Sequence, residues 1–88
     1  MPKKNQHKNF VSVEVAIHLE QWGKLIAQRR KFIKLTHADL GVRLGVSQPT
    51  ISRIERGDPA VAVGTYLAAM YALSLQHKTV PLLAELFS

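Results

Sequence analysis

Two short stretches near the middle of the chain, 36–44 and 47–56, each place apolar side chains on one face of a helix. In both stretches the apolar residues recur three or four positions apart, which is about one helical turn. Most polar residues between them fall on the opposite face. The pattern therefore predicts two short amphipathic helices separated by a tight turn. Their apolar positions are Leu40, Leu44, Ile51 and Ile54.

The residues at the ends of these stretches favour a sharp corner between the two helices. Gly45 lies where a helix end often needs a left-handed residue. Ser47 offers an N-cap oxygen to the second helix, and Pro49 falls in its first turn, where an N–H has no helical partner anyway. Gly57 ends that helix. Two helices joined by a Gly-containing turn form the helix-turn-helix pattern, to which an ordinary helical corner is the structural alternative.

Apolar periodicity predicts three further helices and therefore an all-α fold with five helices. The first covers 18–34, the fourth 63–73 and the last 80–87. In the first helix Arg30 and the neighbouring basic residues lie outside the apolar face. Gly23 weakens the helix by about 1 kcal/mol relative to alanine, so we expect another element to pack closely against it.

Residues 10–16 carry two conflicting patterns. β-Branched residues alternate there with polar or small ones, which predicts a strand. Such a strand has no partner in an all-helical chain, so it would pair with its copy across a dimer. The alternative is that these residues join the next helix, because Val15 also fits its apolar stripe. We expect the strand, with 1–17 as an N-terminal arm or strand and 18–88 as the helix-turn-helix domain.

Basic residues gather around the predicted helix-turn-helix. The net charge is +6, and between Lys24 and Arg56 only Asp39 and Glu55 oppose eight basic side chains. A positive field in this place favours a polyanion such as nucleic acid as the partner, although a basic face can also serve solubility alone. The eight residues are Lys24, Arg29, Arg30, Lys31, Lys34, Arg43, Arg53 and Arg56.

Length and composition exclude several other classes. Eighty-eight residues make one domain, and the absence of cysteine excludes disulfides and thiolate metal sites. There is no Gly-rich phosphate loop and no histidine pair at metal-binding spacing, so we expect neither an enzyme nor a cofactor. No apolar run approaches the ~20 residues that span a bilayer, and no secretory signal is present. We therefore expect a cytoplasmic protein without a membrane partner.

The run from Leu44 to Gly57, Leu-Gly-Val-Ser-Gln-Pro-Thr-Ile-Ser-Arg-Ile-Glu-Arg-Gly, resembles the XRE family of lambda-repressor-like helix-turn-helix regulators. The five-helix layout resembles that family as well. Within it, Gly-Asp-Pro-Ala-Val at 57–61 followed by Gly-Thr-Tyr-Leu at 64–67 is similar to the HipB-like antitoxins, which repress operons encoding HipA-type kinase toxins. The resemblance covers roughly 19–75.

The resemblance implies roles for individual residues. The helix at 47–56 would enter the major groove, with a glutamine suited to adenine and an arginine suited to guanine. The residues expected to contact bases are Gln48, Pro49, Thr50, Ser52 and Arg53. The residues expected to contact phosphates are His37, Arg43, Ser47, Arg56, Gly64 and Thr65, the last two at the start of a helix whose free N–H groups suit an anion.

Three positions depart from the family pattern. His37 stands where the family usually has glutamine, so its phosphate contact is expected to vary with pH. Gly41 replaces the usual alanine in the middle of its helix. Ala62 stands where a serine or threonine commonly caps the fourth helix, which puts the phosphate role of that helix end in question.

The resemblance implies a sequence-specific DNA-binding repressor that acts as a homodimer on a palindromic operator. The HipB-like segment further implies the antitoxin and autoregulator of an operon for a HipA-like kinase toxin. The alternatives are a phage-type or stand-alone XRE repressor without a toxin partner, and an antitoxin that acts chiefly by sequestering its toxin. A neighbouring kinase gene would separate the antitoxin from the stand-alone repressor.

Overall fold

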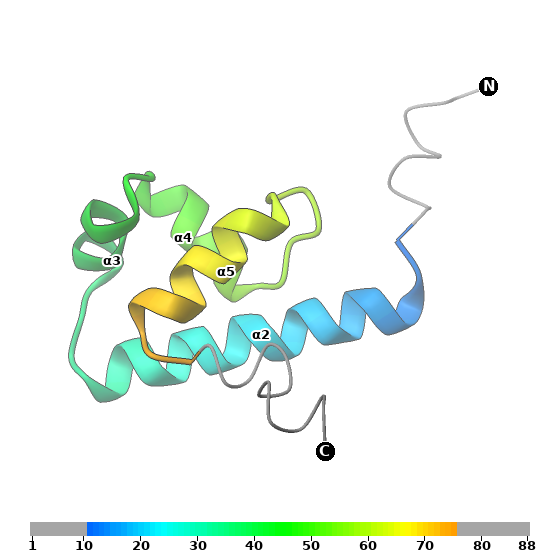
Figure 1. The fold of residues 1–88 in the computed structure, drawn as a ribbon, viewed down its shortest axis with the longest axis horizontal. Coiled ribbons are helices and arrows are strands. Elements are labelled where there is room, and N and C mark those ends of the chain that lie inside the picture. The colour runs from blue at the N-terminus through cyan, green and yellow to red at the C-terminus, as the bar shows by residue number, and fades with distance from the viewer. Residues whose placement is uncertain (1–10, 76–88) are drawn as a thin grey trace, which may run out of the picture.

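The computed structural model describes residues 11–75, which form four α-helices packed around one core (Figure 1). The helices are α2 (Val13–Phe32), α3 (His37–Leu44), α4 (Gln48–Glu55) and α5 (Val63–Ala72), and this part of the chain contains no strand. The all-α prediction is thus confirmed for the described residues. The three shorter helices agree with their predicted positions to within one residue at each end.

The predicted strand at 10–16 is wrong, because helix α2 begins at Val13. Ser12 caps the helix: its Oγ accepts a hydrogen bond from the Val15 N–H at 3.1 Å, and its carbonyl oxygen accepts from the Ala16 N–H at 2.9 Å. A backbone bonded within a helix cannot also pair with a strand of another copy. The predicted boundary between 17 and 18 therefore falls inside α2.

Other predicted segments lie outside the described residues. These are the basic arm at 1–9 and the fifth helix at 80–87. The structure thus describes four helices, and the fifth helix stays a prediction.

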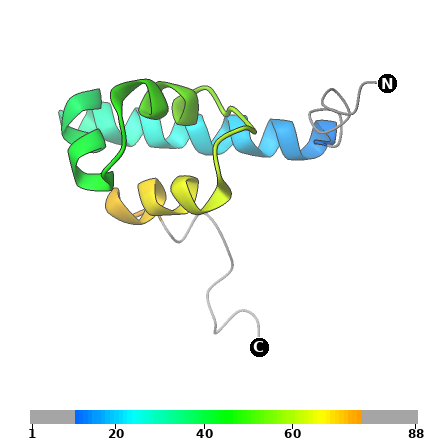
Figure 2. The ribbon, with the colours of Figure 1, turned by 90° about the horizontal axis from the view of Figure 1, so that it is seen from above.

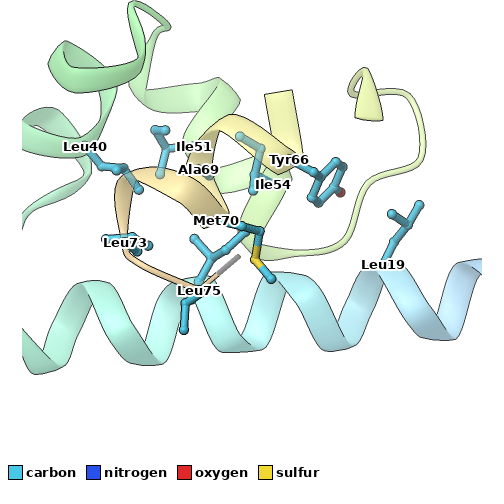
Figure 3. Packing of buried hydrophobic residues seen from close by; sticks show 10 residues of the cluster. Leu19, Leu40, Ile51, Ile54, Tyr66, Ala69, Met70, Leu73 and Leu75 are labelled. Carbon is cyan, nitrogen blue, oxygen red and sulfur yellow. The ribbon is translucent and has the colours of Figure 1, made fainter. Parts of the chain in front are cut away.

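Each helix contributes to the core, which lies between α2 on one side and α3, α4 and α5 on the other (Figures 1 and 3). Of the apolar positions that predicted the helix-turn-helix, Leu40, Ile51 and Ile54 are fully buried there and Leu44 is partly buried. Burying side chains of this size stabilises the fold by about 1.5–3 kcal/mol each relative to exposure. The fully buried large side chains are Ile26, Leu40, Ile51, Ile54, Tyr66, Met70 and Leu73.

Caps and left-handed glycines fix the ends of α3 and α4. Thr36 and Asp39 form a capping box: Thr36 Oγ1 accepts from the Asp39 N–H at 3.0 Å, and Asp39 Oδ2 accepts from the Thr36 N–H at 2.9 Å. Gly45 ends α3 in the left-handed conformation with φ of 71°, and Ser47 caps α4. Gly57 follows α4 with φ of 78°. The predictions for Gly45, Ser47 and Gly57 are confirmed.

Helices α2 and α4 approach each other at Gly23, as its sequence position predicted. A Cβ atom at Gly23 would lie 2.6 Å from the carbonyl oxygens of both Ile54 and Glu55. Only hydrogen atoms fit in that space. Gly23 therefore sets how closely the end of α4 sits against α2.

Candidate nucleic-acid interface

Helix α4 is buried on one face and open on the other. Ile51 and Ile54 are fully buried, whereas Gln48, Pro49 and Arg53 are exposed. Since the polar positions alternate with the buried isoleucines at helical spacing, burial of one face turns the other outward. The outward face carries side chains that donate or accept hydrogen bonds.

These side chains line an open hollow of about 650 Å³ between α4 and the start of α3. The hollow brings together six residues that the sequence assigned to bases or phosphates. Arg53 and Arg56 give it positive charge, and none of its lining residues within the described part of the chain is acidic. The lining residues are His37, Gln48, Pro49, Ser52, Arg53 and Arg56.

At the start of α4, Ser47 and Thr50 bind each other. Ser47 Oγ accepts from the Thr50 N–H at 3.3 Å and lies 3.0 Å from Thr50 Oγ1. The Ser47 oxygen is therefore engaged in capping the helix, and only its remaining hydrogen-bonding capacity faces solvent.

A second hollow, of about 320 Å³, joins α4 to the start of α5. Thr50, Arg53 and Thr65 line it together, so Arg53 borders both hollows. Asp58 also lines it, with one carboxylate oxygen accepting from the Ala60 N–H at 2.8 Å. Thr65 thus lies beside Thr50 and Arg53 of α4.

Three predicted phosphate contacts, Arg43, Ser47 and Gly64, line neither of these hollows. Arg43 is exposed in the last turn of α3, and Gly64 is exposed in the first turn of α5; neither lines either hollow. Ala62 precedes α5 without any side-chain cap, as its sequence position indicated. The N–H groups at the start of α5 therefore have no side-chain acceptor at position 62.

A charged cluster beneath the first hollow holds α4 against α2 and α3. Arg30 on α2 donates to both carboxylate oxygens of Glu55, from Nε at 2.6 Å and from Nη2 at 3.1 Å. Its Nη1 donates to the carbonyl oxygen of Leu35 at 2.8 Å. His37 Nε2 lies 3.1 Å from Glu55 Oε1, so one residue of the hollow is fixed by the same carboxylate.

The cluster shifts the titration of Glu55. Burial by itself would raise the pKa of this carboxyl, but the hydrogen bonds from Arg30 and His37 outweigh it, and the pKa lies below its ordinary value. Glu55 is therefore ionised at neutral pH and acts as the anionic partner of both side chains.

Sequence reasoning missed the role of Arg30. It was placed outside the apolar face, yet only 8% of its surface is exposed. The sequence spacing could have indicated that Arg30 is buried, because Arg30 follows Ile26 by four residues and Gly23 by seven, and both of these are buried. A charged residue on a buried stripe needs a partner, and Glu55 supplies it.

A family model described as a helix-turn-helix domain matches residues 21–83. The chain belongs to the helix-turn-helix domain family. This family is part of the XRE-like class, so the broader resemblance seen in the sequence is confirmed. Searches of curated proteins and of solved structures gave no significant match.

The family match and the exposed face of α4 both indicate binding to DNA. A helix-turn-helix domain indicates sequence-specific DNA binding, and α4 is the second helix of the motif, the position of the recognition helix. Among the described residues no helix is both long and apolar enough to cross a membrane.

Proposed function

We propose that this helix-turn-helix protein is a sequence-specific transcriptional repressor that inserts α4 into the major groove of its operator. The observation that supports this most directly is the outward face of α4, where Gln48, Ser52 and Arg53 line one positively charged hollow. Gln48 suits the N6 and N7 edge of adenine, and Arg53 suits the O6 and N7 edge of guanine. Pro49 offers apolar contact to a thymine methyl group, and Thr50 adds a hydroxyl.

Phosphate contacts would fix α4 in register along the groove. Arg56 and His37 flank its outward face, and Arg43 extends the positive surface along α3. Such contacts position the protein without reading sequence. The N-terminus of α5 would place the N–H groups near Gly64 and Thr65 on a further phosphate, with Ser47 contributing at the start of α4.

The repressor would bind as a homodimer. One recognition helix of eight residues reads only a few base pairs, and a two-fold dimer places two such helices on a palindromic operator about one helical turn apart, ~34–36 Å. Doubling the contact area also raises affinity above that of a single domain.

The test is to select the operator from a random DNA library and then to measure the affinities of variants by fluorescence anisotropy. Arg53→Ala should cost about 1–3 kcal/mol on the selected site and relax preference at one base pair of each half-site. Arg43→Ala should weaken selected and unselected DNA alike. Unchanged affinity and selectivity in Arg53→Ala would exclude α4 as the reading helix.

We further propose that the repressor is the antitoxin of a HipA-like kinase toxin. The support is the segment 57–61 together with 64–67, which is similar to the HipB-like subgroup. The experiment is to co-express the chain with the product of a neighbouring kinase gene. Rescue of growth and co-purification are expected. Operator binding without rescue would favour a stand-alone repressor, whereas rescue without operator binding would favour an antitoxin that acts by sequestration.

A further inference from the structure

A third hollow lies between the N-terminal half of α2 and the start of α5. Figures 1 and 2 both show this part of α2, drawn in blue, extending beyond the other described helices. The hollow measures about 380 Å³, within the range of ~300–1,000 Å³ typical of small-molecule sites. It shares no lining residue with the two hollows beside α4, so a ligand here would not compete with DNA for the same side chains. The lining residues are Glu14, Val15, His18, Leu19, Trp22 and Val63.

This end of the molecule carries acidic but no basic side chains, although the net charge of the chain is +6. From Val11 to Gly23 the sequence contains Glu14 and Glu20 and neither lysine nor arginine. Glu14 is the one acidic residue among the described lining residues. It is exposed, and no salt bridge joins it to another residue within 11–75. The hollow therefore favours a cation over an anion as its ligand.

Trp22 gives the hollow an aromatic wall. The ring of His18 stands nearly perpendicular to the indole, with ring centroids 5.1 Å apart. Among aromatic side chains, tryptophan attracts organic cations most strongly. Trp22 Nε1 is buried and has no hydrogen-bond acceptor among the described residues. Since buried donors are normally paired, this indole is not fixed by a hydrogen bond and can turn when a ligand enters.

Contacts link Trp22 to the DNA-facing surface. Its indole lies against the ring of Tyr66, with centroids 6.3 Å apart. Tyr66 Oη donates to the carbonyl oxygen of Asp58 at 2.8 Å, and Asp58 lines the second hollow together with Arg53. A displacement of the indole therefore acts on the loop that follows α4.

The wall of the third hollow also supports the end of α4. A Cβ atom at Gly57 would lie 2.7 Å from Glu20 Cα and 3.0 Å from the carbonyl carbon of Leu19. Leu19 itself lines the hollow. Because backbone packs against backbone here, a shift of this part of α2 must move the end of α4 as well.

We propose that this hollow is an effector site, which binds a small organic cation with an apolar body and thereby weakens operator binding. The charged group of the ligand pairs with Glu14 and Trp22. Its apolar body contacts Val15, Leu19 and Val63. The effect on DNA rests on the proposed repressor function, whereas binding of the cation does not.

The first test is a fluorescence titration of the full chain without DNA, with excitation of Trp22, the only tryptophan. The probes share one phenyl body and differ in charge: 2-phenylethylamine, 2-phenylethanol and 3-phenylpropanoate. The amine should give a saturable shift and bind about fivefold more tightly than the alcohol, because it adds a charge pair and a cation–π contact. The carboxylate should bind most weakly. No saturable shift with any probe, or equal binding of amine and carboxylate, would overturn the site.

Two variants locate the site. Glu14→Gln should lower affinity for the amine to that for the alcohol. Glu20→Gln is its matched control, since Glu20 is exposed on α2 but does not line the hollow. Val63→Phe should fill the hollow and weaken binding of amine and alcohol alike, whereas Val42→Phe, at an exposed valine of α3, should not. Amine binding that is unchanged in both Glu14→Gln and Val63→Phe would overturn the proposal.

The last experiment measures operator affinity by anisotropy with saturating amine and, as the salt control, with ammonium chloride at equal concentration. The amine should weaken operator binding by about fivefold or more. Tyr66→Phe, which lacks the hydrogen bond to Asp58, should bind the amine as the wild type does and lose most of this effect. Amine binding that leaves operator affinity unchanged would overturn the effector role. A chain that binds the amine but no selected operator would count against the proposed repressor function alone.

Discussion

At the scale of single residues, Glu55 couples the recognition helix to the rest of the protein. Its carboxylate accepts two hydrogen bonds from Arg30 and one from His37, and both Arg30 and Glu55 have side chains about one-tenth exposed. Removing one member of a buried ion pair leaves the other charge without a partner, which costs about 3–5 kcal/mol. Glu55 therefore contributes to stability and to the position of α4 at once.

Glu55→Gln should destabilise the fold by on the order of 3 kcal/mol at pH 7 and should flatten the dependence of stability on pH. The pKa of Glu55 lies below its ordinary value of 4.5, because the hydrogen bonds to the carboxylate outweigh burial. The folded state therefore favours the ionised form. This contribution is fully present above pH 4.5 and is lost as pH falls through the folded-state pKa.

Urea unfolding between pH 3 and pH 7 checks this. The free energy of unfolding of the wild type should fall more steeply with acid than that of Glu55→Gln. Glu20→Gln, at an exposed position of α2, should follow the wild type closely. Parallel pH profiles for Glu55→Gln and the wild type would show that the carboxylate does not stabilise the fold.

The predictability of the candidate site also differs from residue to residue. The outward residues of α4 followed from the spacing of Ile51 and Ile54, because burial of one helix face fixes the other. The burial of Arg30 was not predicted, because charged residues are mostly exposed and its partner Glu55 is 25 positions away in the sequence. Local spacing therefore identified the outward face of α4, whereas the cluster that supports this helix depends on a contact between distant segments.

At the scale of elements, the shorter helices were predictable and the start of α2 was not. Caps and left-handed glycines near 36–57 act within a few residues, so sequence determines them locally. At the start of α2 the β-branched alternation favoured a strand, but Ser12 provides a cap and no described strand offers a partner. Val13, Val15 and Ile17 remain exposed at 71%, 48% and 48%, so the alternation did not mark a buried face.

The crossing of α2 and α4 gives a prediction for Gly23. Alanine favours a helix over glycine by about 1 kcal/mol, so Gly23→Ala would stabilise an isolated helix. Here the added Cβ would lie 2.6 Å from two backbone carbonyl oxygens of α4, and backbone atoms cannot move aside cheaply. The variant should therefore lose about 1–3 kcal/mol in thermal or urea unfolding.

Gln21→Ala, two positions away on the exposed face of α2, is the matched control and should stay within ~0.5 kcal/mol of the wild type. If Gly23→Ala proved as stable as Gln21→Ala, the close approach of the two helices would be wrong. Weaker operator binding by a folded Gly23→Ala would further indicate that this contact sets the position of α4.

At the scale of the whole molecule, charge separates two surfaces. The hollow beside α4 is lined by Arg53 and Arg56, and none of its described lining residues is acidic. The outer face of α5 carries no charge. A protein arranged in this way directs a polyanion to the α4 side of the molecule and away from α5.

The salt dependence of operator binding tests the charged surface as a whole. Each phosphate neutralised by the protein should add about −0.9 to the slope of log K against log salt concentration. Arg56→Ala should therefore make the slope shallower by about 0.9, measured by anisotropy titrations at several salt concentrations. Lys24→Ala, which removes an exposed charge from α2 outside the hollow, should leave the slope nearly unchanged. Equal slopes for Arg56→Ala and the wild type would mean that DNA does not meet the molecule at this face.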